Sequence, residues 1–190
     1  REINTMTISF GHGLAVSPMH LVGGVAAVVN GGIRRPVTLL ASDIPSPGQR
    51  VISQKTSQNM RRLMRLVVEE GTGRKADTPG YVVGGKTGTA EKAGGRGGYK
   101  HKSLMSSFVA AFPMHDPQYV VLIMVDEPKG TKETFGYATG GWVAAPAVSR
   151  IIARSAPLLG VAPVDPEAPE IRRDLMIEQP AEGGKRLASF

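Results

Sequence analysis

The sequence predicts an α+β fold in which an antiparallel sheet packs against helices. Apolar residues recur at helical spacing over 18–29 and again over 60–68. The period then changes, and short β-rich runs follow at 81–89, 104–112 and 119–125. A last amphipathic helix is expected to start near residue 144 and to return onto the sheet.

The first helix is expected to begin at Ser17-Pro18, because a serine N-cap and a proline at the first helical position both favour a helix start. Gly31-Gly32 then ends it. The second helix is predicted to have an apolar face and a basic face. The apolar face is Met60, Leu63, Met64, Val67 and Val68, and the basic face is Arg61, Arg62 and Arg65.

The strands and the last helix are predicted from turn signals and periodicity. The connection from Pro113 to Pro117 is short and suits an antiparallel pair. The apolar run from Tyr119 to Val125 is expected to be buried on both faces. The glycine-rich stretch from Ala93 to Gly98 is expected to be a mobile loop. The last helix is expected to begin at Ala144-Ala145-Pro146, with Val148, Ile151, Ile152, Ser155 and Leu159 along one stripe.

The composition is that of a globular domain, with 41% hydrophobic and 21% charged residues among 190. The longest apolar run is far shorter than the roughly 20 residues that a membrane-spanning helix needs. The formal net charge of +7 is compatible with an anionic partner. Because only 5% of the residues are aromatic, too few for the stacking platforms of single-stranded nucleic-acid binders, we expect no nucleic-acid partner.

Metal binding and a cysteine nucleophile are also disfavoured. The chain has no cysteine, and His12, His20, His101 and His115 lack metal-ligand spacing. Residues 1–160 are expected to form one domain. Residues 161–190 contain Pro163, Pro166, Pro169 and Pro180 and are expected to form an extended or disordered tail.

The segment from Gly84 to Lys92, Gly-Gly-Lys-Thr-Gly-Thr-Ala-Glu-Lys, holds the residues best suited to chemistry. It presents the cation of Lys86 and the hydroxyls of Thr87 and Thr89 on a strand whose glycines allow close approach to the backbone, which suits binding of a carboxylate. Strand alternation places Lys86 and Gly88 on one face and the two threonines on the other, so both sets can act only if the strand borders a cleft. The alternative is an ordinary glycine-rich strand end.

The motif Lys86-Thr87-Gly88-Thr89 resembles the Lys-Thr-Gly element of the penicillin-binding proteins and serine β-lactamases. Four segments resemble blocks of the class B penicillin-binding transpeptidases, in the same order: Gly11 to Leu21 with Asn30-Gly31-Gly32, Glu70 to Gly73, Gly85 to Lys92, and Gly140 to Pro146. The amino-acid sequence from Gly11 to Pro18 most resembles that of the septum-forming, cell-division type. The resemblance extends from Gly11 to about Leu159.

The resemblance implies part of the penicillin-binding transpeptidase fold and an acyl transfer that needs no cofactor. In that family a serine attacks the penultimate D-Ala carbonyl of a peptidoglycan stem peptide, D-Ala leaves, and an amine of a neighbouring strand takes the acyl group. Lys86 would line the cleft and stabilise charge. Thr87 and Thr89 would hold the carboxylate of the substrate or of a β-lactam, and the Thr89 backbone N–H would be one of two oxyanion donors. Gly88 would have to remain small.

The sequence departs from the family at the nucleophile, because no serine here has lysine three residues later, as in Ser-x-x-Lys. We therefore interpret the chain as the C-terminal part of a transpeptidase domain, inactive alone. Ser57-Gln58-Asn59 spells the family's Ser-x-Asn motif but follows the Gly11 block, whereas the family's motif precedes it, so we interpret the match as coincidence. Trp142 and Phe135 are expected to pack at a helix start rather than to touch a ligand.

The resemblance also implies a location and partners. The parent would be anchored by an N-terminal span at the periplasmic face of the bacterial cytoplasmic membrane, with stem peptides and β-lactams as ligands and cell-division membrane proteins as partners. Two alternatives remain: a β-lactamase or carboxypeptidase relative, which the Gly11 to Pro18 block disfavours, and a β-lactam sensor or non-catalytic penicillin-binding module. A pedestal domain after one span upstream would favour the transpeptidase, and several spans with a signalling part would favour the sensor.

The apolar stripes of the second and last helices suit a complete domain, so upstream helices are expected to provide part of their burial. The isolated chain should therefore either form a homodimer or show weak amide protection around Met60 to Val68. Light scattering combined with hydrogen exchange tests this prediction. A rigid, well-protected monomer would contradict it and would indicate a self-sufficient fold.

Overall fold

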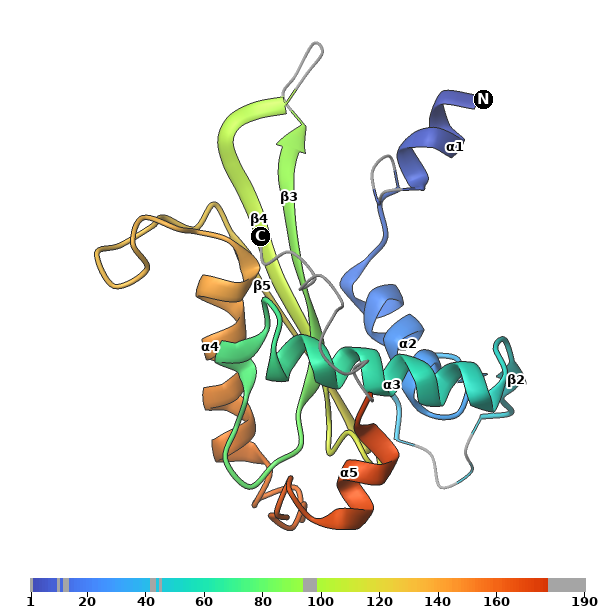
Figure 1. Cartoon of the computed structure of the whole chain (residues 1–190). Coiled ribbons are helices and arrows are strands. Elements are labelled where there is room, and N and C mark those ends of the chain that lie inside the picture. Colours follow the sequence, from blue (N-terminus) through green and yellow to red (C-terminus); the bar gives the residue numbers. More distant parts are fainter. Residues whose placement is uncertain are drawn as a thin grey trace, which may run out of the picture.

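The structure, a computed structural model, describes residues 2–9, 11, 14–41, 44, 46–93 and 99–177. Its centre is an antiparallel sheet of β3 (Gly84–Ala93), β4 (Tyr99–Phe112) and β5 (Tyr119–Asp126), in the order β3-β4-β5. Helix α4 (Gly140–Ser155) packs against the sheet. In Figure 1 it lies to the left of the strands, whereas α2 (Pro18–Val29) and α3 (Gln54–Glu69) lie toward the right. The predicted α+β fold, with a late helix returning onto an antiparallel sheet, is confirmed.

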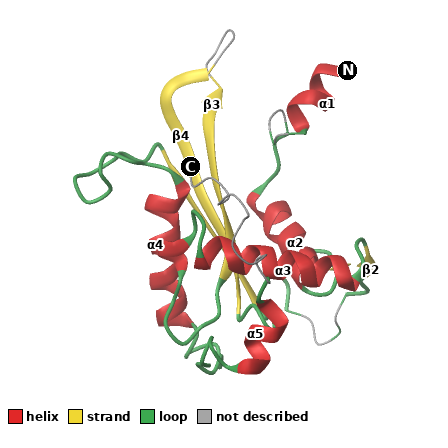
Figure 2. Ribbon diagram, in the orientation of Figure 1, coloured by secondary structure: helices red, strands yellow, loops and turns green. Residues whose placement is uncertain are grey.

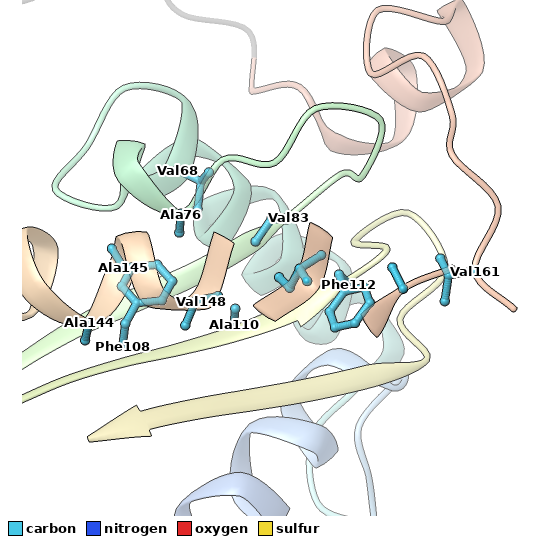
Figure 3. Packing of buried hydrophobic residues seen from close by; sticks show 12 residues of the cluster. Val68, Ala76, Val83, Phe108, Ala110, Phe112, Ala144, Ala145, Val148 and Val161 are labelled. Atoms are coloured by element: carbon cyan, nitrogen blue, oxygen red, sulfur yellow. The ribbon is translucent and has the colours of Figure 1, made fainter. Parts of the chain in front are cut away.

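Strand alternation divides the core between the two faces of β4. Phe108, Ala110 and Phe112 point toward α4, where they form one cluster with Ala144, Ala145, Val148 and Ile152 (Figure 3). Ala111 belongs instead to a second cluster with Val29 of α2 and Met64 of α3. Because both faces of β4 are covered, the sheet is held between helices, and β3 remains at its edge.

The shorter elements frame this core. They are α1 (Glu2–Ile8), β1 (Ile33–Arg34), β2 (Gln49–Arg50), a 3₁₀ turn η1 (Arg74–Ala76) and α5 (Pro169–Leu175). Strands β1 and β2 pair with each other in a separate two-stranded ribbon. Figure 2 shows that a long loop leads from β5 to α4 and extends away from the sheet.

The predicted helix signals operate as expected for α2. The Ser17 side chain accepts a hydrogen bond from the His20 N–H at 3.2 Å, and Pro18 is the first helical residue. After the helix, Gly31 and Gly32 have φ angles of +91° and +90°, which favour glycine. In α3 the equivalent cap is Ser53, which accepts from the Thr56 N–H at 3.0 Å, so this helix starts before its apolar stripe.

The predicted start of the last helix is wrong. Helix α4 begins at Gly140, and Pro146 lies inside it instead of at its first position. The early start follows from tertiary packing, since residues 140 and 141 lie against β3, β4 and the turn after α3. The predicted stripe is also incomplete: Val148 and Ile152 are buried, whereas Ile151 is 40% exposed and Leu159 lies beyond the helix.

Arg65 does not lie on an exposed basic face as predicted, because it is only 5% exposed. Its guanidinium donates to Glu69 Oε1 and Asp77 Oδ1, both at 2.9 Å, and to the Val83 carbonyl at 2.8 Å. Burial of this charge is tolerated because two carboxylates and a carbonyl satisfy it. The arginine thereby joins α3, the η1 turn and the residue before β3.

The stretch 161–177 differs from the extended tail expected from its prolines. Val161, Ile171 and Leu175 are buried, and Pro169 occupies the first turn of α5. Ile171 and Leu175 are one helical turn apart and pack in the cluster that contains Met64. Residues 178–190, and most of the glycine-rich loop predicted after Ala93, lie outside the described residues.

Lys92 connects the outer strands at the far end of the sheet. Its ammonium lies 2.5 Å from Asp126 Oδ1 and 3.2 Å from Glu127 Oε1. The hydrogen bond with Asp126 and the further pairing with Glu127 raise the pKa of Lys92.

None of the helices in the described part of the chain is both long and apolar enough to cross a bilayer.

Candidate active site

The Lys-Thr-Gly-Thr motif lies on the edge strand β3. Among the described residues β3 pairs only with β4, where Lys86 lies opposite Val109, Thr87 opposite Phe108, Gly88 opposite Ser107 and Thr89 opposite Ser106. The Gly88 carbonyl faces β4 and accepts from Ser107 Oγ at 3.4 Å. The Thr87 carbonyl faces the unpaired edge, where it accepts from Lys86 Nζ at 2.9 Å. In a β-strand the N–H and the C=O of one residue point to the same side, and residues two apart repeat this direction. The backbone N–H groups of Thr87 and Thr89 therefore also face the unpaired edge.

The edge position brings together groups that alternation alone would separate. The side chain of Lys86 is exposed, and its ammonium reaches the neighbouring residue Thr87. Its ammonium lies 3.4 Å from Thr87 Oγ1 as well as 2.9 Å from the Thr87 carbonyl oxygen. A cation and a hydroxyl that start on opposite faces of the strand therefore meet at one place.

A second hydroxyl, which the sequence analysis included only as part of the Glu70 to Gly73 block, joins them there. Thr72, in the turn after α3, places its Oγ1 3.0 Å from Thr87 Oγ1. The turn belongs to the Glu70 to Gly73 block of the resemblance, but periodicity and spacing carry no signal for a contact across 15 residues. The three groups at the unpaired edge are thus Lys86, Thr87 and Thr72, which we call the edge cluster.

Thr89 is held by the beginning of α4. The Gly140 N–H donates to Thr89 Oγ1 at 3.1 Å. A hydroxyl oxygen that accepts this bond still has its own proton to donate. The first turn of α4 therefore leaves the Thr89 hydroxyl as a donor toward whatever approaches β3.

Glycine is required where α4 meets β3. A Cβ on Gly140 would lie 2.2 Å from the Ser107 carbonyl oxygen and 2.7 Å from the Gly88 carbonyl oxygen, and one on Gly141 would lie 2.4 Å from the Thr72 carbonyl oxygen. These neighbours are backbone atoms and cannot rotate away. At Gly88 itself the neighbour is the Ser107 hydroxyl, 2.5 Å from a built Cβ, which has rotational freedom.

An aromatic cluster lies at the start of α4. Trp142 stacks on Tyr137 with ring centroids 5.4 Å apart and meets Phe135 edge-on at 5.8 Å. Lys75 Nζ lies 3.6 Å from the centroid of the Trp142 ring. Trp142 therefore has the packing contacts at the start of a helix that the sequence suggested, and it also ties the turn that carries Thr72 to α4.

Ser106, Ser107 and Ser57 make hydrogen bonds that hold the fold together. Ser106 is fully buried and donates to the Ala138 carbonyl at 2.6 Å, and Ser107 donates to Gly88. Ser57 of the Ser-x-Asn match is 1% exposed; its hydroxyl donates to the Val28 carbonyl at 2.5 Å and accepts from the Gly31 N–H at 3.0 Å. These contacts join α3 to α2, so Ser57 has a structural role in the described chain.

The edge cluster lies outside the apolar hollow that the described chain forms. An apolar hollow of about 700 Å³ does exist, but it lies between α2 and the segment 34–39, lined by residues such as Ala27, Val28 and Pro36. The edge cluster is separate from it and is open to solvent at Lys86. Within the described ranges, no three His, Asp or Glu side chains lie close enough to bind a metal ion together.

A sequence model of the penicillin binding protein transpeptidase domain matches residues 1–153, which include all the residues of the edge cluster. The chain belongs to this family. This match, together with the relatives and solved structures that follow, confirms the resemblance to the class B penicillin-binding transpeptidases and the fold that it implies.

Individual relatives of this transpeptidase domain agree. The chain is 50% identical, over 80% of its length, to a probable peptidoglycan D,D-transpeptidase FtsI from Caulobacter vibrioides, and 41% identical, over 85%, to the stage V sporulation protein D of Bacillus subtilis. It spans only 28% and 26% of the lengths of these two relatives.

Solved structures give the same result. The apo transpeptidase domain of Burkholderia pseudomallei penicillin-binding protein 3 matches with a TM-score of 0.75 and 41% identity, over 87% of this chain and 49% of that one. Penicillin-binding protein 3 of Mycobacterium tuberculosis, solved with ampicillin, matches with a TM-score of 0.69 and 28% identity, over 88% of this chain and 40% of that one. The chain thus covers about half of a transpeptidase domain.

We predict that Gly140→Ala destabilises the chain by about 1–3 kcal/mol, because the methyl group would force backbone atoms of β3 and β4 away from α4. Gly24→Ala in α2 is the matched control. Its Cβ would have no neighbour within 4 Å, so the change should stabilise the helix by about 0.5–1 kcal/mol. Denaturant unfolding measures both. A Gly140→Ala chain as stable as the wild type would contradict the observed approach of α4 to β3.

Proposed function

We propose that this chain is the C-terminal part of the catalytic domain of a penicillin-binding D,D-transpeptidase that crosslinks peptidoglycan during septal cell-wall synthesis. The observation that carries the proposal is the meeting of a cation and hydroxyls at the unpaired edge of β3, in a chain of the transpeptidase family. The Caulobacter relative, a probable peptidoglycan D,D-transpeptidase, supports the reaction, and the ampicillin complex of the Mycobacterium relative supports β-lactams as ligands.

Carboxylate binding is the task that the side chains suit best. Lys86 supplies positive charge, and Thr87 and Thr89 supply hydroxyl donors. The Gly140 N–H occupies a lone pair of Thr89 Oγ1, which favours donation of the Thr89 proton to an incoming anion. These residues would hold the terminal carboxylate of a stem peptide or the carboxylate of a β-lactam.

Oxyanion stabilisation is the task of the backbone. The Thr89 N–H faces the unpaired edge of β3, where a substrate carbonyl can lie beside the strand. In acyl transfer, negative charge develops on that carbonyl oxygen, and loss of one such donor typically costs about 10²–10³ in rate. Gly88 would have to remain small because a side chain next to the donor would keep the substrate away.

The nucleophile would come from outside the chain. Neither Ser106 nor Ser107 is free to act, and no Ser-x-x-Lys is present. We propose that a serine of an upstream Ser-x-x-Lys segment attacks the penultimate D-Ala carbonyl, that D-Ala leaves, and that an amine of a second stem peptide takes the acyl group. Lys86 would stabilise the charge that develops in this cleft, and no cofactor is invoked.

The transpeptidase names of the relatives favour this function over a β-lactamase, a carboxypeptidase or a non-catalytic sensor module. We propose the periplasmic face of the bacterial cytoplasmic membrane as the location, with an anchor outside this chain. Peptidoglycan stem peptides and β-lactams would be its ligands and cell-division membrane proteins its partners.

The first test is covalent labelling. We expect the 190-residue chain to form no adduct with a fluorescent penicillin, because the acylated serine is missing, whereas a longer protein that adds the upstream Ser-x-x-Lys segment should be labelled. Gel fluorescence and intact mass measure this. Labelling of the 190-residue chain on one of its own hydroxyls would overturn our interpretation of the chain as a fragment.

The second test concerns Lys86. In the longer protein, Lys86→Ala should slow acylation by about 10²-fold or more with a nearly unchanged Tm, because an exposed ammonium at the strand edge supports the reaction and not the core. Lys55→Ala, an exposed lysine in the first turn of α3, is the control and should leave acylation unchanged. Equal acylation by the wild type and Lys86→Ala would remove Lys86 from the site.

A further inference from the structure

The hydrogen bond between Thr72 and Thr87 leaves one hydroxyl proton of the pair unused. The ammonium of Lys86 can only donate, so at 3.4 Å from Thr87 Oγ1 it occupies a lone pair of that oxygen. The two hydroxyls, 3.0 Å apart, share one proton between them. In either arrangement one hydroxyl proton of the pair is left over and is available to an anion outside.

We propose that Thr72 is a specificity-determining residue that adds a further hydroxyl donor to the carboxylate-binding position of Lys86, Thr87 and Thr89. The proposal rests on the proposed function and names a residue beyond the Lys-Thr-Gly-Thr motif. When the carboxylate of the stem peptide or β-lactam binds, both hydroxyls rotate out of their mutual hydrogen bond and each donates its own proton to the carboxylate, so Thr72 adds a donor that Thr87 alone does not supply. Thr72 is exposed, so its hydroxyl is accessible from the side of the unpaired edge.

Three sets of contacts hold Thr72 and its turn in this position. Its carbonyl oxygen rests against Gly141, where a built Cβ would be only 2.4 Å away. Lys75, in the same turn, lies over the ring of Trp142 at 3.6 Å. Further along, Asp77 is bound by Arg65 at 2.9 Å, and its carbonyl accepts from Ser149 Oγ of α4, also at 2.9 Å. A donor fixed in this way binds an anion without the entropy loss of ordering a loop.

Preference for a charged carboxylate is the property that separates this role from a purely structural one. The longer protein described above is assayed with benzylpenicillin and with its neutral methyl ester, and the second-order acylation constants give an acid-to-ester ratio. Thr72→Val keeps the shape and removes the hydroxyl, and it should lower this ratio by about tenfold or more, as loss of a hydrogen bond to a charged group does. Thr72→Ser keeps the hydroxyl and should retain the ratio within about twofold.

The control is Thr38→Val, which removes an exposed hydroxyl that accepts from the Leu40 N–H and should leave the ratio unchanged. An unchanged ratio in Thr72→Val, or equal losses for acid and ester that follow a fall in Tm, would overturn the role of Thr72 alone. A ratio lowered as much in Thr72→Ser would overturn it too. Absence of acylation of the wild-type longer protein would instead overturn the proposed function, and this inference with it.

Discussion

The close approach of the first turn of α4 to strands β3 and β4 is the constraint on which the site depends. Gly140 and Gly141 lie where any side chain would collide with backbone oxygens of Ser107, Gly88 and Thr72. Only at this separation can the Gly140 N–H reach the Thr89 hydroxyl. Gly140 and Gly141 therefore determine both how α4 packs on the sheet and how the Thr89 hydroxyl is held.

Buried charge fixes the other end of this arrangement. Arg65 links α3 to Asp77 in the turn and to Val83, the residue before β3. The turn and the strand therefore cannot shift separately without leaving a charge unpaired in the interior. Ser149 of α4 binds the carbonyl of the same Asp77. The position of Thr72 relative to Thr87 follows from these contacts, all of which lie away from the edge that a ligand would use.

The edge position of β3 explains how one short motif can combine two kinds of group. In a central strand, Lys86 and Thr87 would project into opposite layers of the fold and could not act together. At an edge, the lysine ammonium reaches the neighbouring residue Thr87, and unpaired backbone groups remain available to a ligand. The chain matches about half of a solved transpeptidase domain.

The sequence by itself determined two of the helices, the strands of the main sheet and the family. The cap and periodicity of α2, the periodicity of α3 and the identity of the Lys86 to Thr89 motif are local patterns, and local hydrogen bonds and side-chain alternation suffice to predict them. Tertiary structure decided that Arg65 is buried, that α4 starts at Gly140, and that Thr72 meets Thr87. Each of these depends on groups brought together from separate segments, and the free energy of burying a charge or excluding a side chain exists only once those segments are packed.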